Sequence, residues 1–86
     1  MNRDDIYRLI DDERTRQAGK WAEPHAWGKG DCSSRAVPSI VKVAVLTEEV
    51  GEVARAVLDV EVDREHLRAE LVQVAAVAVA WMESLP

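Results

Sequence analysis

The stretch that decides the fold is Val45-Leu46-Thr47-Glu48-Glu49-Val50-Gly51-Glu52-Val53-Ala54-Arg55-Ala56. Most of it is apolar, as a packed helix requires, but three of its residues are carboxylates. Residues three apart share a face of a helix, so Glu49 and Glu52 point the same way. Glu48 is turned about 100° from Glu49. The stretch therefore predicts a packed helix that presents two acids together on one face.

A second helical stretch, residues 67–73, adds another acid, Glu70, which follows Glu52 by 18 residues. If the two helices lie antiparallel, Glu70 can converge with Glu49 and Glu52. Clustered carboxylates repel one another, so a bound cation is the simplest reason to bring them together. Ligand sets made only of oxygen suit Mg²⁺ or Mn²⁺. The spacing therefore predicts a divalent metal site between two helices.

Length and composition indicate one small globular domain covering residues 1–86. The chain is 48% hydrophobic and 31% charged, unlike a disordered protein. Its net charge of −5 argues against nucleic acid as the main partner, although a small anion could still bind through a metal. Cys32 is the single cysteine, which excludes an internal disulfide and is compatible with a reducing cytoplasm. The first residues lack the apolar core of a signal peptide, and residues 71–82 are too short to span a bilayer. We expect a cytoplasmic protein that does not contact membranes.

Caps and periodicity predict three helices and an all-α fold. The first covers residues 3–20, with Asn2 as its N-cap and Gly19 near its end. The second covers residues 39–58, and the third begins after Asp63, a good N-cap, and ends near Ser84. Apolar residues at helical spacing predict a buried stripe on the second helix, made of Ile40, Val43, Leu46, Val50, Val53, Ala54 and Val57.

Residues 21–38 predict a loop, because they hold glycines, prolines, serines and an aspartate. A loop of this length in a compact domain suggests a lid or a binding segment. Trp21 and Trp27 alternate there with His25 and with basic residues. Such tryptophans either pin the loop onto the helices or stack on a nucleotide base. No second histidine or cysteine stands at zinc-ligand spacing from His25.

The third helix is apolar on nearly every side between residues 71 and 82. A helix that is apolar on all sides must be covered on all sides. Three helices and a loop do this poorly, so we expect a helical hairpin that completes a bundle by oligomerisation, as a homodimer or homotetramer.

Taken together, the Glu48-Glu49-x-x-Glu52 motif, the later Glu70-x-x-Gln73 and the segment Arg16-Gln17-Ala18-Gly19-Lys20-Trp21 resemble the MazG-like all-α nucleoside triphosphate pyrophosphohydrolases, in particular small phage and bacterial members. The resemblance covers roughly residues 13–85. It departs from the family's pattern at Gln73, where the last metal ligand is usually an aspartate.

The resemblance implies a Mg²⁺- or Mn²⁺-dependent hydrolase of nucleotide metabolism that releases pyrophosphate and a nucleoside monophosphate. It implies that Glu49, Glu52 and Glu70 hold the metal, with the neutral Gln73 as a weaker fourth group. Glu48 is the candidate base. The candidates for substrate binding are Lys20, Trp21 and Arg55, and more weakly Arg16 and Lys29. The alternative is a non-catalytic helical oligomerisation or nucleotide-sensing module of the same fold, in which the acids form a solvated helix face.

Overall fold

Three helices make up most of the chain in the computed structural model, which describes residues 1–86. They are α1 (Arg3–Lys20), α2 (Ser39–Leu58) and α3 (Arg64–Ser84). Two short strands, β1 (Pro24–His25) and β2 (Gly28–Lys29), form an antiparallel hairpin between α1 and α2. The predicted all-α character and the three predicted helices are confirmed; the hairpin is an addition within the predicted loop.

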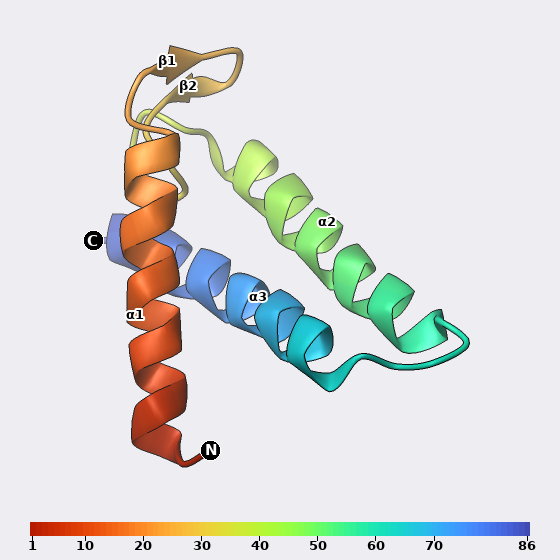
Figure 1. The fold of residues 1–86 in the computed structure, drawn as a ribbon. Helices are drawn as coiled ribbons and strands as arrows, with labels where there is room; N and C mark the ends of the chain where they lie inside the picture. The colour runs from red at the N-terminus through yellow and green to blue at the C-terminus, as the bar shows by residue number, and fades with distance from the viewer.

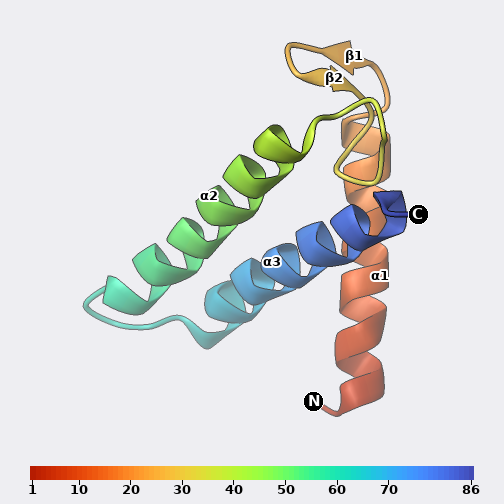
Figure 2. The ribbon, with the colours of Figure 1, turned by 180° about the vertical axis from the view of Figure 1, so that it is seen from behind.

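Helix α3 lies between the other two (Figure 1). It runs antiparallel to α2 and crosses α1 near its own C-terminal end, whereas α1 and α2 do not pack against each other. The reverse view shows the same divergence of α1 from α2 (Figure 2). The result is an open arrangement in which the hairpin stands above the space between α1 and α2.

The helix ends follow from their caps. The Asn2 side chain accepts a hydrogen bond from the Asp5 backbone N–H, and the Asp5 carboxylate accepts one from the Asn2 N–H, a reciprocal capping box. The Asp63 carboxylate accepts hydrogen bonds from the backbone N–H groups of Glu65 and His66. Both predicted N-caps are confirmed. Gly19 lies inside the last turn of α1, which continues to Lys20.

The hairpin depends on a glycine at a tight approach. Gly28 has a φ of 135°, a conformation that other residues rarely adopt. A Cβ atom at this position would lie only 2.6 Å from the carbonyl oxygen of Ala36. The hairpin can therefore fold back onto residues 36–37 only with glycine here.

The apolar core is small. Its buried members come from the loop and the inner faces of α2 and α3: Cys32, Val37, Ala56, Ala76, Val77 and Ala80. Their small side chains allow the helices to approach closely. Cys32 packs with Val77 and Ala80, so its place is in the core and not in a polar loop.

The predicted buried stripe on α2 is wrong for the single chain. Helix α2 turns Lys42, Glu49 and Ala56, seven residues apart, toward the rest of the molecule. The residue that directly follows each of these three faces outward. Val43, Val50 and Val57 are accordingly 42–51% exposed. Ile40 is 75% exposed and Ala54 is also exposed, while Leu46 and Val53 are half-buried.

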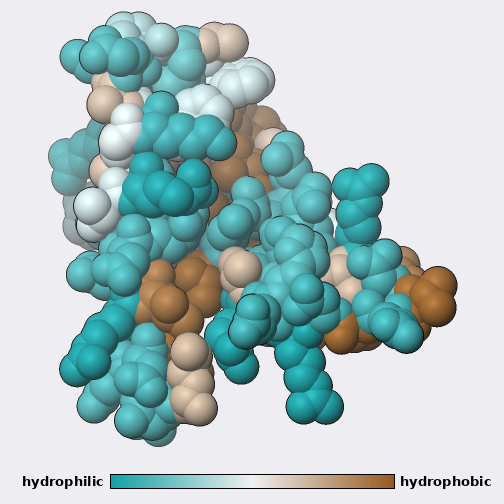
Figure 3. All heavy atoms as spheres, viewed as in Figure 1, coloured by the Kyte–Doolittle hydropathy of each residue, from teal (hydrophilic) through white to brown (hydrophobic).

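The molecule is more open than its mass requires. Its accessible surface is 6148 Å². A compact monomer of this mass would expose about 5,100 Å². Its radius of gyration is 13.5 Å, against about 12 Å for a compact domain of this length. Hydrophobic atoms also lie at the tip of the α2–α3 connection, where Val60 is fully exposed (Figure 3). None of the helices is long and apolar enough to cross a membrane.

Candidate functional site

Two acids from different helices are partly shielded from solvent where α2 packs against α3. Glu49 of α2 and Glu70 of α3 each have an Oε2 atom that is buried and makes no hydrogen bond. Glu70 is only 9% exposed as a whole residue. A buried carboxylate oxygen without a partner is costly, which makes such atoms rare and marks them for explanation.

The surroundings of Glu49 disfavour its charged form. Burial raises the pKa of the Glu49 carboxyl, and neighbouring negative charges raise it further. Those charges belong, in decreasing order, to Glu70, Glu48, Glu52 and Glu13. The predicted acids Glu48, Glu49, Glu52 and Glu70 of α2 and α3, together with Glu13 of α1, therefore form one electrostatic group, which we call the acid cluster.

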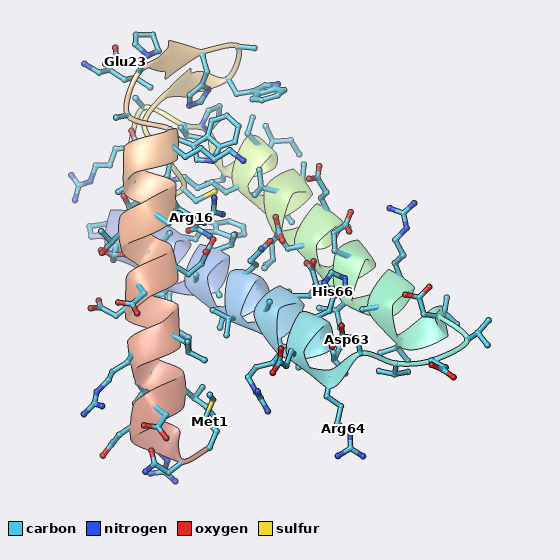
Figure 4. The ribbon with its side chains drawn as sticks, viewed as in Figure 1. Met1, Arg16, Glu23, Asp63, Arg64 and His66 are labelled. Atoms are coloured by element: carbon cyan, nitrogen blue, oxygen red, sulfur yellow. The ribbon has the colours of Figure 1, made fainter.

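Members of the acid cluster are not arranged as a finished metal site. A carboxylate oxygen of Glu52 lies 3.9 Å from Arg55, and Oε1 of Glu70 lies 3.7 Å from Nε2 of His66. Figure 4 labels His66 on the first turn of α3. No three His, Cys, Asp or Glu side chains stand close enough to hold a metal ion without moving. The free Oε2 atoms of Glu49 and Glu70 are nonetheless hard oxygen donors of the kind that Mg²⁺ and Mn²⁺ take, so these residues fit a divalent ion.

A cavity of about 710 Å³ opens beside the acid cluster, between α1, the hairpin and α2. Its volume is within the range of small-molecule sites. Figure 3 shows hydrophobic side chains set back between the hairpin end of α1 and α2. Polar and charged side chains of the cavity include Glu13, Arg16, Gln17, Lys20, Asp31, Glu48, Glu49 and Gln73.

Three aromatic rings lie at the hairpin end of the cavity. Trp21 and His25 meet edge to face with centroids 5.4 Å apart, and Trp27 lies 6.1 Å from His25. Nε2 of His25 is 2.7 Å from the carbonyl oxygen of Gly30, which can only accept. Nε2 therefore carries the proton, and Nδ1 accepts a hydrogen bond from the Trp27 backbone N–H. The hairpin thus fixes the imidazole ring. The sequence left Trp27 open between packing and base stacking and assigned no role to His25; both line the cavity.

The predicted basic residues divide into two groups. Arg16 and Lys20 of α1 line the cavity, and Lys20 Nζ lies 5.1 Å from the centre of the Trp21 ring. Figure 4 labels Arg16 on α1. Lys29 and Arg55 do not line the cavity, and the Arg55 side chain is 81% exposed. The structure therefore brings Arg16, Lys20 and Trp21 together with Glu48, Glu49 and Gln73.

Glu13 is a cavity residue that the sequence did not single out. Its side chain is only 12% exposed, and its carboxylate is held by Arg16 and Gln17. The hydrogen bond from Arg16 lowers the pKa of Glu13. A signal was present, because Glu13 continues the stripe of Ile6, Leu9 and Ile10 and so faces the same side as those apolar residues.

An ion network holds the loop under the cavity in place. Arg14 donates to Asp31 at 2.7 Å and to Glu83 at 2.7 Å, joining α1, the loop and α3. Burial opposes the ionisation of Asp31, but hydrogen bonds from Ser33 and Arg14 outweigh it and lower its pKa. Cys32, the next residue, is buried, which raises the pKa of its thiol, so the loop presents no reactive thiolate.

No protein family, curated protein or solved structure in the comparisons matches this chain.

Proposed function

We propose that the protein is a metal-dependent nucleoside triphosphate pyrophosphohydrolase of the MazG-like type, which releases pyrophosphate and a nucleoside monophosphate. The observation that carries the proposal is the pair of buried, unpartnered carboxylate oxygens of Glu49 and Glu70. Glu49 lines a cavity that also holds two basic side chains and three aromatic rings, whereas Glu52 and Glu70 lie outside its lining. A site for a metal-bound nucleotide needs carboxylates that bind the metal ion, basic side chains that bind the phosphates, and aromatic rings that stack on the base.

Glu49 and Glu70 would hold the metal, joined by Glu52 and the amide oxygen of Gln73. Glu52 is free to turn from Arg55, because an exposed pair of this length is worth little. A bound Mg²⁺ or Mn²⁺ would supply charge stabilisation on the phosphates and a more acidic water. The unpaired oxygens support this assignment, since a ligand oxygen must be free of competing hydrogen bonds.

The remaining residues bind and orient the substrate. Arg16 and Lys20 contact the triphosphate, and Trp21, with Trp27 beside it, stacks on the base. Glu48 lines the cavity but is exposed, so it can take a proton from the water that attacks the α-phosphorus. Lys29 and Arg55 lie outside the cavity and contribute only if the hairpin or α2 moves.

Self-association is part of the proposal. The single chain exposes roughly 1,000 Å² more than a compact monomer of its mass. A stable dimer buries about 800 Å² on each partner. Val43, Val50 and Val57 recur every seven residues on the outer face of α2, the spacing of a helix-pairing seam. We therefore assign this stripe to the contact with a second copy.

A nucleotide-sensing module without turnover is the second candidate. One observation favours it: no three His, Cys, Asp or Glu side chains stand close enough together to hold a metal ion. Such a module would use the same cavity and rings but would not need a metal.

Pyrophosphate release from a panel of ribo- and deoxynucleoside triphosphates, with Mg²⁺ or Mn²⁺, tests the proposal. We expect release by the natural protein and none by Glu49→Gln. Glu65→Gln, an exposed acid at the start of α3, should be fully active. Tight nucleotide binding without any release would favour the sensing module.

A further inference from the structure

An uncharged face runs along the outside of α2, which packs against α3 but not against α1 (Figure 1). It lies opposite the line of Lys42, Glu49 and Ala56. We call it the outer face, and its exposed members are Ile40, Val43, Ala44, Thr47, Val50, Gly51, Ala54, Val57 and Leu58. The surplus surface of the single chain, roughly 1,000 Å², exceeds the about 800 Å² that a stable dimer buries on each partner. A second copy is therefore the occupant that fits this face.

Gly51 stands in the middle of the outer face, where its own chain gives no reason for a glycine. A Cβ atom at Gly51 would meet nothing within 4 Å. Glycine inside a helix is less favourable than alanine, and its structural use there is to let another backbone approach closely. Ala44 and Ala54 leave similar room on either side. Gly51 therefore marks the point where a second helix crosses α2.

The two edges of the outer face differ in charge. Glu48 and Arg55 are exposed seven residues apart along one edge, and Val43, Val50 and Val57 form the opposite edge. A two-fold axis between antiparallel copies of α2 brings like edges together, valines against valines and charges against charges. Parallel copies would set the charged edge of one helix against the valine edge of the other. The charge pattern therefore favours antiparallel pairing.

The register of such a pair follows from its axis at Gly51. Glu48 lies three residues before Gly51 and Arg55 lies four residues after it, so Glu48 of one copy would stand beside Arg55 of the other. Arg55 is available for this contact, because its side chain is 81% exposed. Its pair with Glu52 in the same chain is long, at 3.9 Å, and such exposed pairs are weak.

The position beside Glu48 is also the edge of the cavity, which Glu48 lines. Within a single chain Arg55 lies outside this cavity. The bases that line it are Arg16 and Lys20, and they are outnumbered by four acids: Glu13, Asp31, Glu48 and Glu49. A site that binds a triphosphate needs more positive charge than this, and a guanidinium from the second copy supplies it.

We propose that two copies pair through antiparallel α2 helices that cross at Gly51, and that Arg55 of each copy completes the triphosphate site of the other. The substrate in this inference rests on the proposed function. The guanidinium binds phosphate oxygens through parallel N–H···O hydrogen bonds, with Glu48 beside it. Each site is therefore incomplete in a single chain.

Pulsed electron paramagnetic resonance between nitroxide labels tests the pairing without any nucleotide. The label is attached at Ser39→Cys, on the first residue of α2, in a Cys32→Ala background that removes the natural thiol. Ser39 precedes Gly51 by twelve residues, so antiparallel copies hold the two labels roughly 36 Å apart along the helices. A separation close to the interaxial distance, about 10 Å, would show parallel copies and overturn the pairing.

Gly51→Leu tests the crossing point. The larger side chain blocks close approach, so we expect a monomer of unchanged helicity in light scattering and circular dichroism at micromolar concentration. Gly19→Leu is the matched control, because Gly19 is also an exposed helical glycine whose Cβ would meet nothing within 4 Å. It should leave the assembly unchanged. Unchanged assembly of Gly51→Leu would overturn the crossing at Gly51.

Mixing of impaired variants tests whether Arg55 acts in the site of the other copy. Arg55→Met should lower turnover by about a hundredfold, whereas Arg64→Met, at an exposed arginine outside the cavity, should be fully active. Arg55→Met and Glu49→Gln, refolded together in equal amounts, should regain about a quarter of the natural turnover. Half of the dimers are then mixed, and each mixed dimer has one complete site. Glu48→Gln refolded with Glu49→Gln should regain nothing, because both residues serve the cavity of their own chain.

No gain from the mixture of Arg55→Met and Glu49→Gln would overturn the role of Arg55 and leave the proposed function standing, as would full turnover by Arg55→Met alone. If the natural protein hydrolyses no nucleotide, the proposed function and the role of Arg55 are both wrong, and the label distance decides the pairing by itself. A natural protein that stays monomeric would overturn the pairing.

Discussion

Glu49 is the residue on which the proposed site depends, and its titration is measurable without any ligand. Burial, followed by the charges around it, raises its pKa in the folded protein. A raised carboxyl pKa means that the folded state holds a proton that the unfolded state releases. The contribution of Glu49 to stability is therefore full below about pH 4.3 and is lost as pH rises through its folded pKa.

Replacing Glu49 with glutamine should stabilise the metal-free protein at pH 8. The substitution removes a buried charge, and its amide can donate to the unpaired oxygen of Glu70. If these two changes raise the free energy of unfolding by about 1 kcal/mol, the melting temperature rises by about 4–8 °C in a domain of this size. At pH 4 the difference should shrink, because Glu49 is then protonated. Calorimetric melting curves at both pH values test this, with Glu65→Gln as the unaffected control; equal melting temperatures at pH 8 would contradict it.

Trp21 should contribute to nucleotide affinity more than to folding. A base stacked on an aromatic ring gains about 1–3 kcal/mol, or roughly 5- to 150-fold in affinity. Trp21→Ala should weaken binding of a non-hydrolysable triphosphate by a factor in this range, measured by calorimetry. Tyr7→Ala removes an exposed ring of α1 that does not line the cavity and should leave the affinity unchanged. Unchanged affinity combined with a lower melting temperature would make Trp21 a packing residue.

Helical spacing predicted that Glu49 and Glu70 face each other across α2 and α3, and each has one buried, unpartnered oxygen in the structure. The sequence did not identify Glu13 as a cavity residue, and it left Trp27 open between packing and base stacking. Their positions depend on how α1 crosses α3 and on how the hairpin folds back at Gly28. Those are long-range features, which periodicity within one helix does not encode.

At the scale of elements, the Arg14 network decides whether the loop stays under the cavity. The Arg14 and Asp31 side chains are 12% and 5% exposed, whereas the Glu83 side chain is 51% exposed. Breaking a buried pair leaves a charge without a partner, so Asp31→Asn should cost about 3 kcal/mol. Glu83→Gln removes the exposed partner of the same arginine and should cost less than about 1 kcal/mol. Urea unfolding of both variants measures the difference, and equal costs would contradict the role given to Asp31.

The pH dependence of that network has the opposite sign to that of Glu49. The lowered pKa of Asp31 means that its contribution is full above about pH 3.9 and is lost as pH falls through the folded value. The destabilisation caused by Asp31→Asn should therefore diminish in acid.

Element boundaries were the most predictable part of the fold. Local caps at Asn2 and Asp63, and Pro38 before α2, fix them within the chain itself. The outward face of α2 was not predictable in the same way. Its apolar stripe is real, but α3 packs against the neighbouring line of Lys42, Glu49 and Ala56, where Lys42 donates to Ser84 at 2.8 Å.

For the whole molecule, the surplus of exposed surface predicts a dimer or a larger assembly. Light scattering coupled to gel filtration at micromolar concentration should give at least twice the chain mass. Val50→Lys places a charge in the centre of the outer stripe of α2 and should shift the protein toward monomer while retaining its helicity. Val60→Lys, at a fully exposed valine outside that stripe, should leave the assembly unchanged. A monomeric natural protein with full helicity would contradict the assignment.

In the proposed reaction, water attacks the α-phosphorus of a nucleoside triphosphate at the Glu49–Glu70 site. Hydrolysis in ¹⁸O-labelled water with Mg²⁺ or Mn²⁺, followed by mass spectrometry of the products, tests it most directly. We expect one labelled oxygen in the nucleoside monophosphate, unlabelled pyrophosphate, and no reaction by Glu49→Gln. Label in the pyrophosphate, release of nucleoside diphosphate and phosphate, or no turnover of any nucleotide by the folded protein would contradict it.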